Sequence, residues 1–241
     1  LFEISGDQVV VNAGADIDVE SGASHDVSVQ STDSAGNTIT ENFTINVNNI
    51  NEGPTDLIVA GGSVDEGAAA GSVVANLSTV DADSGESFTY ALTDASGRIE
   101  ISGDQVVVKA GADIDFESGA AHSVSVQSTD SAGNTITESF TINVNDINES
   151  PTDIVVSGGA IDEGAAAGSV VANLSTVDAD AGESFTYALT DASGLFEISG
   201  DQVVVNAGAD IDVESGASHD VSVQSTDSAG NTITENFTIN V

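Results

Sequence analysis

The sequence has no cysteine, methionine or tryptophan in its 241 residues, and it has only three histidines. Without cysteine, the chain can form no disulfide bond, no thiolate metal site and no thiol nucleophile. Three histidines also leave few ligands for a zinc centre. These absences exclude disulfide-stapled scaffolds and cysteine-dependent enzymes.

Basic residues are almost absent. Arg98 and Lys109 stand against 40 acidic residues, which gives a formal net charge of -38. A nucleic-acid-binding surface needs Lys and Arg to displace counterions from phosphates, and an anionic membrane surface attracts the same residues. We therefore expect no nucleic-acid partner and no membrane binding.

Long hydrophobic runs are missing as well, because no stretch approaches the roughly 18 consecutive apolar residues of a membrane-spanning helix. We therefore expect no membrane insertion. The chain nevertheless contains 39% hydrophobic residues. That content is enough to build cores, which argues against disorder in spite of the charge.

The sequence repeats itself. Residues 1–47 recur without a change as residues 195–241, an offset of 194, and half that offset relates Pro54 to Pro151. A repeat of 97 residues predicts three segments: the C-terminal half of a repeat at 1–51 and complete repeats at 52–148 and 149–241. The opening in mid-repeat suggests an excised fragment.

Apolar residues alternate with polar ones at a period of two. Phe140, Ile142 and Val144 alternate with Ser, Thr and Asn, and Phe88, Tyr90 and Leu92 do the same. This period is typical of half-buried strands, and Gly, Asp, Asn and Ser clusters supply the turns between them. Seven short strands per repeat predict an all-β fold, a tandem array of antiparallel β-sandwiches of the immunoglobulin-like Greek-key type.

The first segment poses a structural problem. It supplies the last four strands of a repeat and none of the first three, so alone it would expose an apolar face and open strand edges. Either preceding residues complete it, or another molecule does.

The acidic residues gather at turns in short fixed patterns, with almost no Lys or Arg beside them. Several carboxylates at one end of a sandwich repel each other unless a cation lies among them. Calcium takes six to eight oxygen ligands from flexible loops, whereas magnesium takes fewer protein ligands. The EF-hand spacing fails from Asp81, because Gly85 and Leu92 occupy the fifth and twelfth positions.

Four acidic motifs follow one another in a fixed order. They are Glu66 and Glu163, the pairs Asp81/Asp83 and Asp178/Asp180, the pair Asp115/Glu117 with Asp130 and Asp227 after it, and the linker Asp146-Ile147-Asn148-Glu149 before Pro151. This is the order found in cadherin repeats, and the sequence resembles the cadherin-like tandem domains of large bacterial surface proteins over its whole length.

The resemblance implies that calcium ions are held where two repeats meet. The implied ligands between the complete repeats are Glu66, Asp115, Glu117, Asp146, Asn148, Glu149, Asp178, Asp180 and Asp227. Those of the upstream junction are Asp18, Glu20, Asn51, Glu52, Asp81, Asp83 and Asp130. Glu163, Asp212 and Glu214 would form an incomplete site at the far end. The linker is one residue shorter than the animal cadherin pattern, so the number of ions per junction stays open.

Each of these candidate residues also has a simpler structural interpretation. A lone Asp or Glu is usually a solvated surface residue, and His25, His122 and His219 fit structural roles. Asp115 and Glu117 could be the paired acids of a glycosidase, but they recur in every repeat, and active sites are seldom built in tandem. We therefore expect that the protein is not an enzyme.

The functional hypothesis is a calcium-binding extender segment of a secreted or cell-surface bacterial adhesin, active in cell adhesion or biofilm formation and stiffened by calcium. Its expected partners are calcium ions, neighbouring repeats, and like molecules or surface polysaccharide. The alternative is a carbohydrate-binding module of a polysaccharide-active protein, although tryptophan, a usual sugar platform, is absent.

Overall fold

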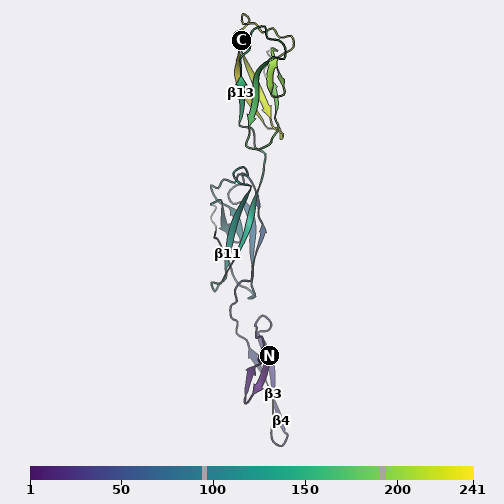
Figure 1. The fold of residues 1–241 in the computed structure, drawn as a ribbon. Helices are drawn as coiled ribbons and strands as arrows, with labels where there is room; N and C mark the ends of the chain where they lie inside the picture. Colours follow the sequence, from purple (N-terminus) through teal and green to yellow (C-terminus); the bar gives the residue numbers. More distant parts are fainter. Residues whose placement is uncertain (94–96, 190–193) are drawn as a thin grey trace. The chain divides into compact units, whose positions relative to one another are not determined.

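The computed structural model describes residues 1–93, 97–189 and 194–241, and all regular secondary structure in these ranges is β (Figure 1). The chain divides into two compact units. One consists of Leu1–Asp115 and Ala120–Asn145, and the other of Phe116–Gly119 and Asp146–Val241. The three-segment division derived from the sequence repeat stays a prediction.

The first unit begins with two hairpins that carry the first half-repeat. Strands β1 (Phe2–Ser5) and β2 (Gln8–Val11) form one two-stranded sheet, and β3 (Ser24–Thr32) and β4 (Thr38–Asn46) form another. Phe2 stacks edge-on against His25 with ring centroids 5.7 Å apart, so the two hairpins touch.

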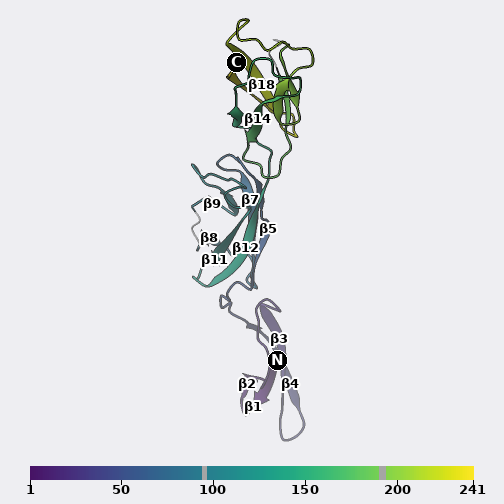
Figure 2. The same ribbon diagram turned by 45° about the horizontal axis from the view of Figure 1, so that its top comes forward.

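The rest of the first unit is a sandwich of two four-stranded sheets (Figure 2). One sheet has the order β5-β7-β10-β9 and the other β6-β12-β11-β8. The strands are β5 (Asp56–Gly61), β6 (Ser63–Asp65), β7 (Val73–Val80), β8 (Thr89–Leu92), β9 (Ile99–Ser102), β10 (Gln105–Val108), β11 (Ala121–Thr129) and β12 (Thr135–Asn145).

The second unit repeats this sandwich with sheets β13-β14-β17-β16 and β15-β18-β19. The strands are β13 (Asp153–Gly158), β14 (Val170–Val177), β15 (Thr186–Leu189), β16 (Phe196–Ser199), β17 (Gln202–Val205), β18 (Ser218–Thr226) and β19 (Thr232–Asn240).

The period-two pattern places the apolar side chains between the sheets. Ile142 and Val144 on β12 are buried, and Thr141 and Asn143 between them are exposed. In the second unit, Val203, Val223 and Ile239 are fully buried in one cluster. The prediction of an all-β sandwich is confirmed. Each strand has one apolar face, and packing the two sheets together removes these faces from water.

The sequence reading missed one strand. The pair Gly61-Gly62, with φ of 122° and 111°, lets the chain cross from one sheet to the other. Beyond it, β6 pairs with β12 in parallel, which departs from the expected antiparallel arrangement. Three residues are too few to show a period, so only the tertiary fold reveals this strand.

No helix in the described ranges is long and apolar enough to cross a membrane.

The crossover glycines are expected to resist substitution. At Gly158, with φ of 119°, an added Cβ would lie 2.6 Å from the carbonyl oxygen of Val171, whereas at Gly164, with φ of 71°, nothing lies within 4 Å. Gly164→Ala should lower the free energy of unfolding by the left-handed backbone strain alone, about 1–2 kcal/mol. Gly158→Ala should lower it by about 1–3 kcal/mol more, because the added Cβ overlaps the Val171 carbonyl oxygen. Chemical unfolding, with hydrogen exchange in β13 and β14, measures the difference; equal losses would contradict this account.

Candidate metal centres

Two loops at one end of the second sandwich carry the buried Asp227 and the half-buried Asp178 and Asp180. Asp178 and Asp180 directly follow β14, and the Asp180 amide donates to Asp178 Oδ1 at 3.2 Å. Asp227 directly follows β18 and opens the turn to β19, where Asn231 donates its backbone N and its Nδ2 to the two carboxylate oxygens at 2.7 and 2.8 Å. Both positions follow from the strand ends, since β-turns favour Asp and Asn there.

The segment before β13 is tied to the same loops. The Glu149 amide donates to Asp180 Oδ2 at 2.9 Å, and Asn148 Nδ2 donates to Asp227 Oδ2 at 3.0 Å. Residues separated by 31 and 79 positions in the chain thus share one hydrogen-bonded network.

Three carboxylates crowd together beside this network. Asp178, Glu183 and Asp227, here called the Asp178 group, offer oxygens that lie within 4.8 Å of one another. Asp178 Oδ2 is buried and has no hydrogen-bond partner. A desolvated, unpaired carboxylate oxygen beside two further carboxylates is strongly unfavourable without a cation.

Glu183 was not among the predicted ligands. Its carboxylate accepts hydrogen bonds from the backbone N and the Oγ of Ser228, at 3.2 and 2.8 Å, so it is held at the turn that Asp227 opens. A signal for it exists in the sequence, because Glu183 follows the Asp-Ala-Asp motif on the same loop, and Glu86 does so in the preceding repeat.

A second acidic group in this unit joins Glu117, Asp146 and Asp180, again with oxygens within 4.8 Å of one another. A hollow of about 310 Å³ lies beside it and is lined by Asp146, Asn148, Asp180 and Glu183 among others. The space is sufficient for a cation with water in its coordination shell.

The ionised form of Asp227 is favoured although its side chain is only 6% exposed. Burial raises its pKa, but hydrogen bonds from the Asn148 and Asn231 side chains outweigh burial and hold the pKa below the ordinary 3.8. Asp130 behaves alike, with Asn51 and Asn134 as donors. Both carboxylates therefore remain negatively charged when the fold is intact.

The first unit repeats the arrangement. The Glu52 amide donates to Asp83 Oδ2 at 2.8 Å, and Asn51 Nδ2 donates to Asp130 Oδ2 at 2.9 Å. Asn49, a residue outside the predicted set, donates to Asp83 Oδ1 at 2.6 Å. Asp81 Oδ2 is buried without a hydrogen-bond partner, as in the matching position of the other repeat.

The acidic group of the first unit consists of Glu20, Glu52 and Asp83, with oxygens within 4.8 Å of one another. A hollow of about 300 Å³ is lined by Asp18, Glu20 and Glu52 among others. Hydrogen bonding between the Asp18 and Glu20 side chains lowers the pKa of Asp18 and raises the pKa of Glu20. The two carboxylates therefore titrate as a coupled pair.

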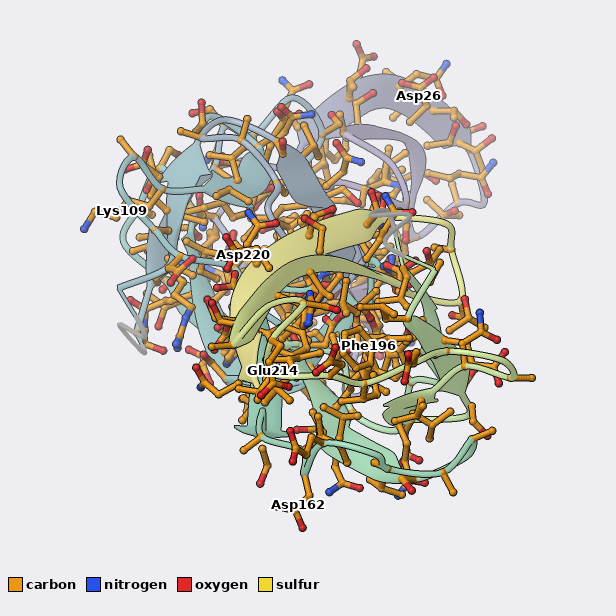
Figure 3. All side chains as sticks on the ribbon, turned by 90° about the horizontal axis from the view of Figure 1, so that it is seen from above. Asp26, Lys109, Asp162, Phe196, Glu214 and Asp220 are labelled. Carbon is orange, nitrogen blue, oxygen red and sulfur yellow. The ribbon has the colours of Figure 1, made fainter. Side chains whose placement is uncertain are left out.

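A third group in the second unit comprises Glu163, Asp212 and Glu214, with Glu163 and Glu214 exposed. Asp212 accepts from the Glu214 amide at 3.0 Å and from Ser215 Oγ at 2.9 Å, and the side chain of Glu214 is the largest cause of its lowered pKa. Figure 3 shows the neighbouring Asp162 pointing away from the ribbon.

Glu66 and Asp115 are brought close to each other by backbone hydrogen bonds in the first unit. The Glu66 amide donates to the Asn145 carbonyl at 3.1 Å, and the adjacent Gly67 amide donates to the Ile114 carbonyl at 2.8 Å. Their loops therefore adjoin the end of β12.

The two basic residues are far outnumbered by the acids. Arg98 Nε donates to the Asp113 carbonyl at 3.1 Å, and Lys109 is exposed and points outward (Figure 3). The donors to Asp180 and Asp227 described above are neutral amides. Hard oxygens in several loops, with a buried orphan oxygen in each copy, fit a hard divalent cation.

The comparisons with known proteins address the fold. No family model and no curated protein matches the chain. Solved structures do match: protocadherin gamma B7 extracellular cadherin domains 1–4 (19% identity, TM-score 0.72, 100% of this chain, 64% of that one), mouse protocadherin-24 EC1–3 (18%, 0.70, 100% and 86%) and mouse cadherin-23 EC22–24 (20%, 0.68, 97% and 78%).

The chain is thus an all-β array of tandem sandwiches with acidic clusters, and its fold is that of cadherin repeats. It spans less than two thirds of the protocadherin gamma B7 structure. The resemblance noted in the sequence is confirmed for the fold, and the ligand role of each predicted residue stays a prediction.

Neutralising Asp178 tests whether the Asp178 group is electrostatically strained. Asp178→Asn keeps Oδ1 as the acceptor for the Asp180 amide and removes one charge from the group. With a chelator present, the variant should melt higher by about 2–4 °C because repulsion falls. Asp201→Asn, at an exposed turn, is the matched control and should change little. A lower melting temperature for Asp178→Asn in differential scanning calorimetry would refute the strain.

Proposed function

We propose that the acidic groups bind calcium and that calcium stiffens the repeats into an extended stalk. The observation that carries the proposal is the buried, unpartnered Oδ2 of Asp178 and of Asp81, each on the Asp-Ala-Asp loop of its repeat. The same unsatisfied oxygen occurs in both complete repeats, whose sequences are nearly identical here, and each such oxygen requires a partner.

The donor set favours calcium over other cations. It consists of carboxylate oxygens on loops, and the chain has no cysteine. Magnesium demands a tight octahedron and keeps its waters, whereas calcium accepts more oxygens in flexible geometry. The proposed ligands in the second unit are Glu117, Asp146, Asp178, Asp180, Glu183 and Asp227.

Calcium binding would couple the loops of a sandwich to its linker. The Glu149 and Asn148 hydrogen bonds already hold the linker against Asp180 and Asp227. An ion that binds the folded arrangement and not the unfolded chain stabilises the fold by mass action. The two positive charges of the ion would thus offset the repulsion among the carboxylates, which two basic residues are too few to neutralise.

We further propose that the chain is an extender segment of a secreted or cell-surface bacterial adhesin. The cadherin-like fold supports an extracellular setting, and the near-identical repeats suit a spacer whose length is set by repeat number. Affinities of about 10⁻⁴ to 10⁻³ M, typical of extracellular calcium modules, would suffice.

Calcium should stabilise the wild-type chain by more than it stabilises the Asp178→Asn variant. At about one hundred times the dissociation constant, each independent site adds about 2.7 kcal/mol. Asp178→Asn, which should be more stable than the wild type in chelator, should therefore be less stable than the wild type in calcium. Calorimetric titration and melting curves measure this reversal.

Magnesium at equal concentration and the Asp201→Asn variant are the controls. Equal stabilisation by both ions would indicate nonspecific screening of the net charge. A full calcium response in Asp178→Asn would remove Asp178 from the ligand set.

Removal of calcium should also shorten the average end-to-end distance of the chain. Without the ion, repulsion loosens the linkers and more bent arrangements become populated. Small-angle scattering in calcium and in EDTA measures the change, with far-ultraviolet circular dichroism to show that the sandwiches stay folded. Superimposable scattering profiles would reject the stalk mechanism.

A further inference from the structure

The two linkers of the chain differ at one position beside the acidic loops. Residues 48–54 and 145–151 agree at five of seven positions, and the two changes are Asn49 to Asp146 and Gly53 to Ser150. Other linker contacts are the same in both copies, because in each a linker Asn donates to the buried Asp that opens a β-turn and a linker Glu amide donates to the Asp-Ala-Asp loop. The two copies therefore differ mainly in what Asn49 and Asp146 do.

The side chain at this position meets the Asp-Ala-Asp loop in opposite ways. Asn49 Nδ2 donates to Asp83 Oδ1 at 2.6 Å. Asp146 places a carboxylate oxygen within 4.8 Å of oxygens of Glu117 and of Asp180, the counterpart of Asp83. An ionised carboxylate only accepts hydrogen bonds, so Asp146 cannot make the contact that Asn49 makes. One linker thus carries an attraction where the other carries a repulsion.

Both oxygens of Asp83 receive a donor from the linker. Glu52 donates its amide to Oδ2 at 2.8 Å, and Asn49 donates to Oδ1. The side chain of Asp83 is 6% exposed. Its counterpart Asp180 is only half-buried and lines the hollow beside Asp146. Asn49 therefore completes the donors around a buried carboxylate, whereas Asp146 leaves the matching carboxylate open to the hollow.

We propose that this linker position decides whether a linker needs calcium to be held against its sandwich. Asn49 supplies an N–H donor at Asp83 that stands in for a cation, so the first linker is held without an ion. Asp146 supplies one more carboxylate, so the second linker is held less tightly without an ion and more tightly with one. The role of Asp146 rests on the proposed calcium function, whereas that of Asn49 rests on its hydrogen bond alone.

Calcium affinity should differ between the linkers for the same reason. An ion that binds Asp83 must displace the Asn49 amide or share the oxygen with it, whereas an ion at Asp180 has Asp146 as a further ligand. The number of charged ligands is one of the factors that set the affinity of a calcium site. The second linker should therefore bind calcium more tightly than the first and respond to it more strongly.

The hydrogen-bond half of the proposal is tested in EDTA with the full 241-residue chain. The Glu52 and Glu149 amides both lie in an Ile-Asn-Glu sequence, so their intrinsic exchange rates match. Their hydrogen exchange, measured by NMR, therefore reports how firmly each linker is held. We expect the Glu52 amide to exchange more slowly than the Glu149 amide, by about fivefold or more.

Reciprocal variants should exchange the two behaviours. Asn49→Asp should speed exchange of the Glu52 amide, and Asp146→Asn should slow exchange of the Glu149 amide, each by about fivefold. Asn48→Asp is the matched control, because it adds the same charge at an exposed neighbouring position and keeps the Asn49 hydrogen bond. It should change exchange of the Glu52 amide by less than about twofold, since an exposed charge is screened by salt.

The calcium half is tested by titration calorimetry on the same proteins. The wild type should show a tighter and a weaker class of sites. Asp146→Asn should weaken the tighter class by about tenfold, and Asn49→Asp should tighten the weaker class, because each changes the number of charged ligands. In the wild type, calcium should slow exchange of the Glu149 amide by a larger factor than that of the Glu52 amide. Asp146→Asn should remove this difference.

The outcomes separate this proposal from the calcium function itself. Equal exchange of the two amides in EDTA would overturn the proposal even if the wild type binds calcium. Equal calcium affinities of the wild type and Asp146→Asn would overturn it as well. A wild type that binds no calcium would refute the proposed function and with it the role of Asp146. Slow exchange at Glu52 that Asn49→Asp removes would still support the role of Asn49.

Discussion

Repulsion among carboxylates is the constraint on which this protein depends. Forty acidic residues share the chain with two basic ones, so ion pairs cannot satisfy the acids that the fold brings together. Amide donors from Asn148, Asn231 and backbone groups hold individual oxygens of Asp227 and Asp180 but do not remove their charge. The Oδ2 of Asp178 receives no donor, so the fold leaves this oxygen unsatisfied.

The repeat arranges these acids at the ends of strands for a simple reason. A strand rises by about 3.3 Å per residue and ends in a polar turn, so strands that run in the same direction deliver the residues after them to the same end of a sandwich. Asp178 after β14 and Asp227 after β18 meet in this way although 49 positions separate them. The linker residues Asn148 and Glu149 reach the same end because they lead directly into β13.

Identical sequence does not ensure identical burial. Val11 and Val205 have the same neighbours along the chain, and one is half-exposed to water while the other is fully buried. Hydrophobic burial depends on surface supplied by distant segments, here β14 and β15, and not on the local sequence. The half-repeat at 1–47 therefore keeps its hairpins, which need only local pairing, and lacks a core.

The sequence by itself determined the repeat, the all-β class and the loops that carry the acids, because a period of two and turn residues such as Asp130 are local signals. Only the tertiary structure decided which acids meet. It added Glu183 to Asp178 and Asp227, and it revealed β6, whose three residues pair in parallel with β12. Such contacts depend on strand order and sheet packing, which join residues far apart in the chain and leave no periodic trace in the sequence.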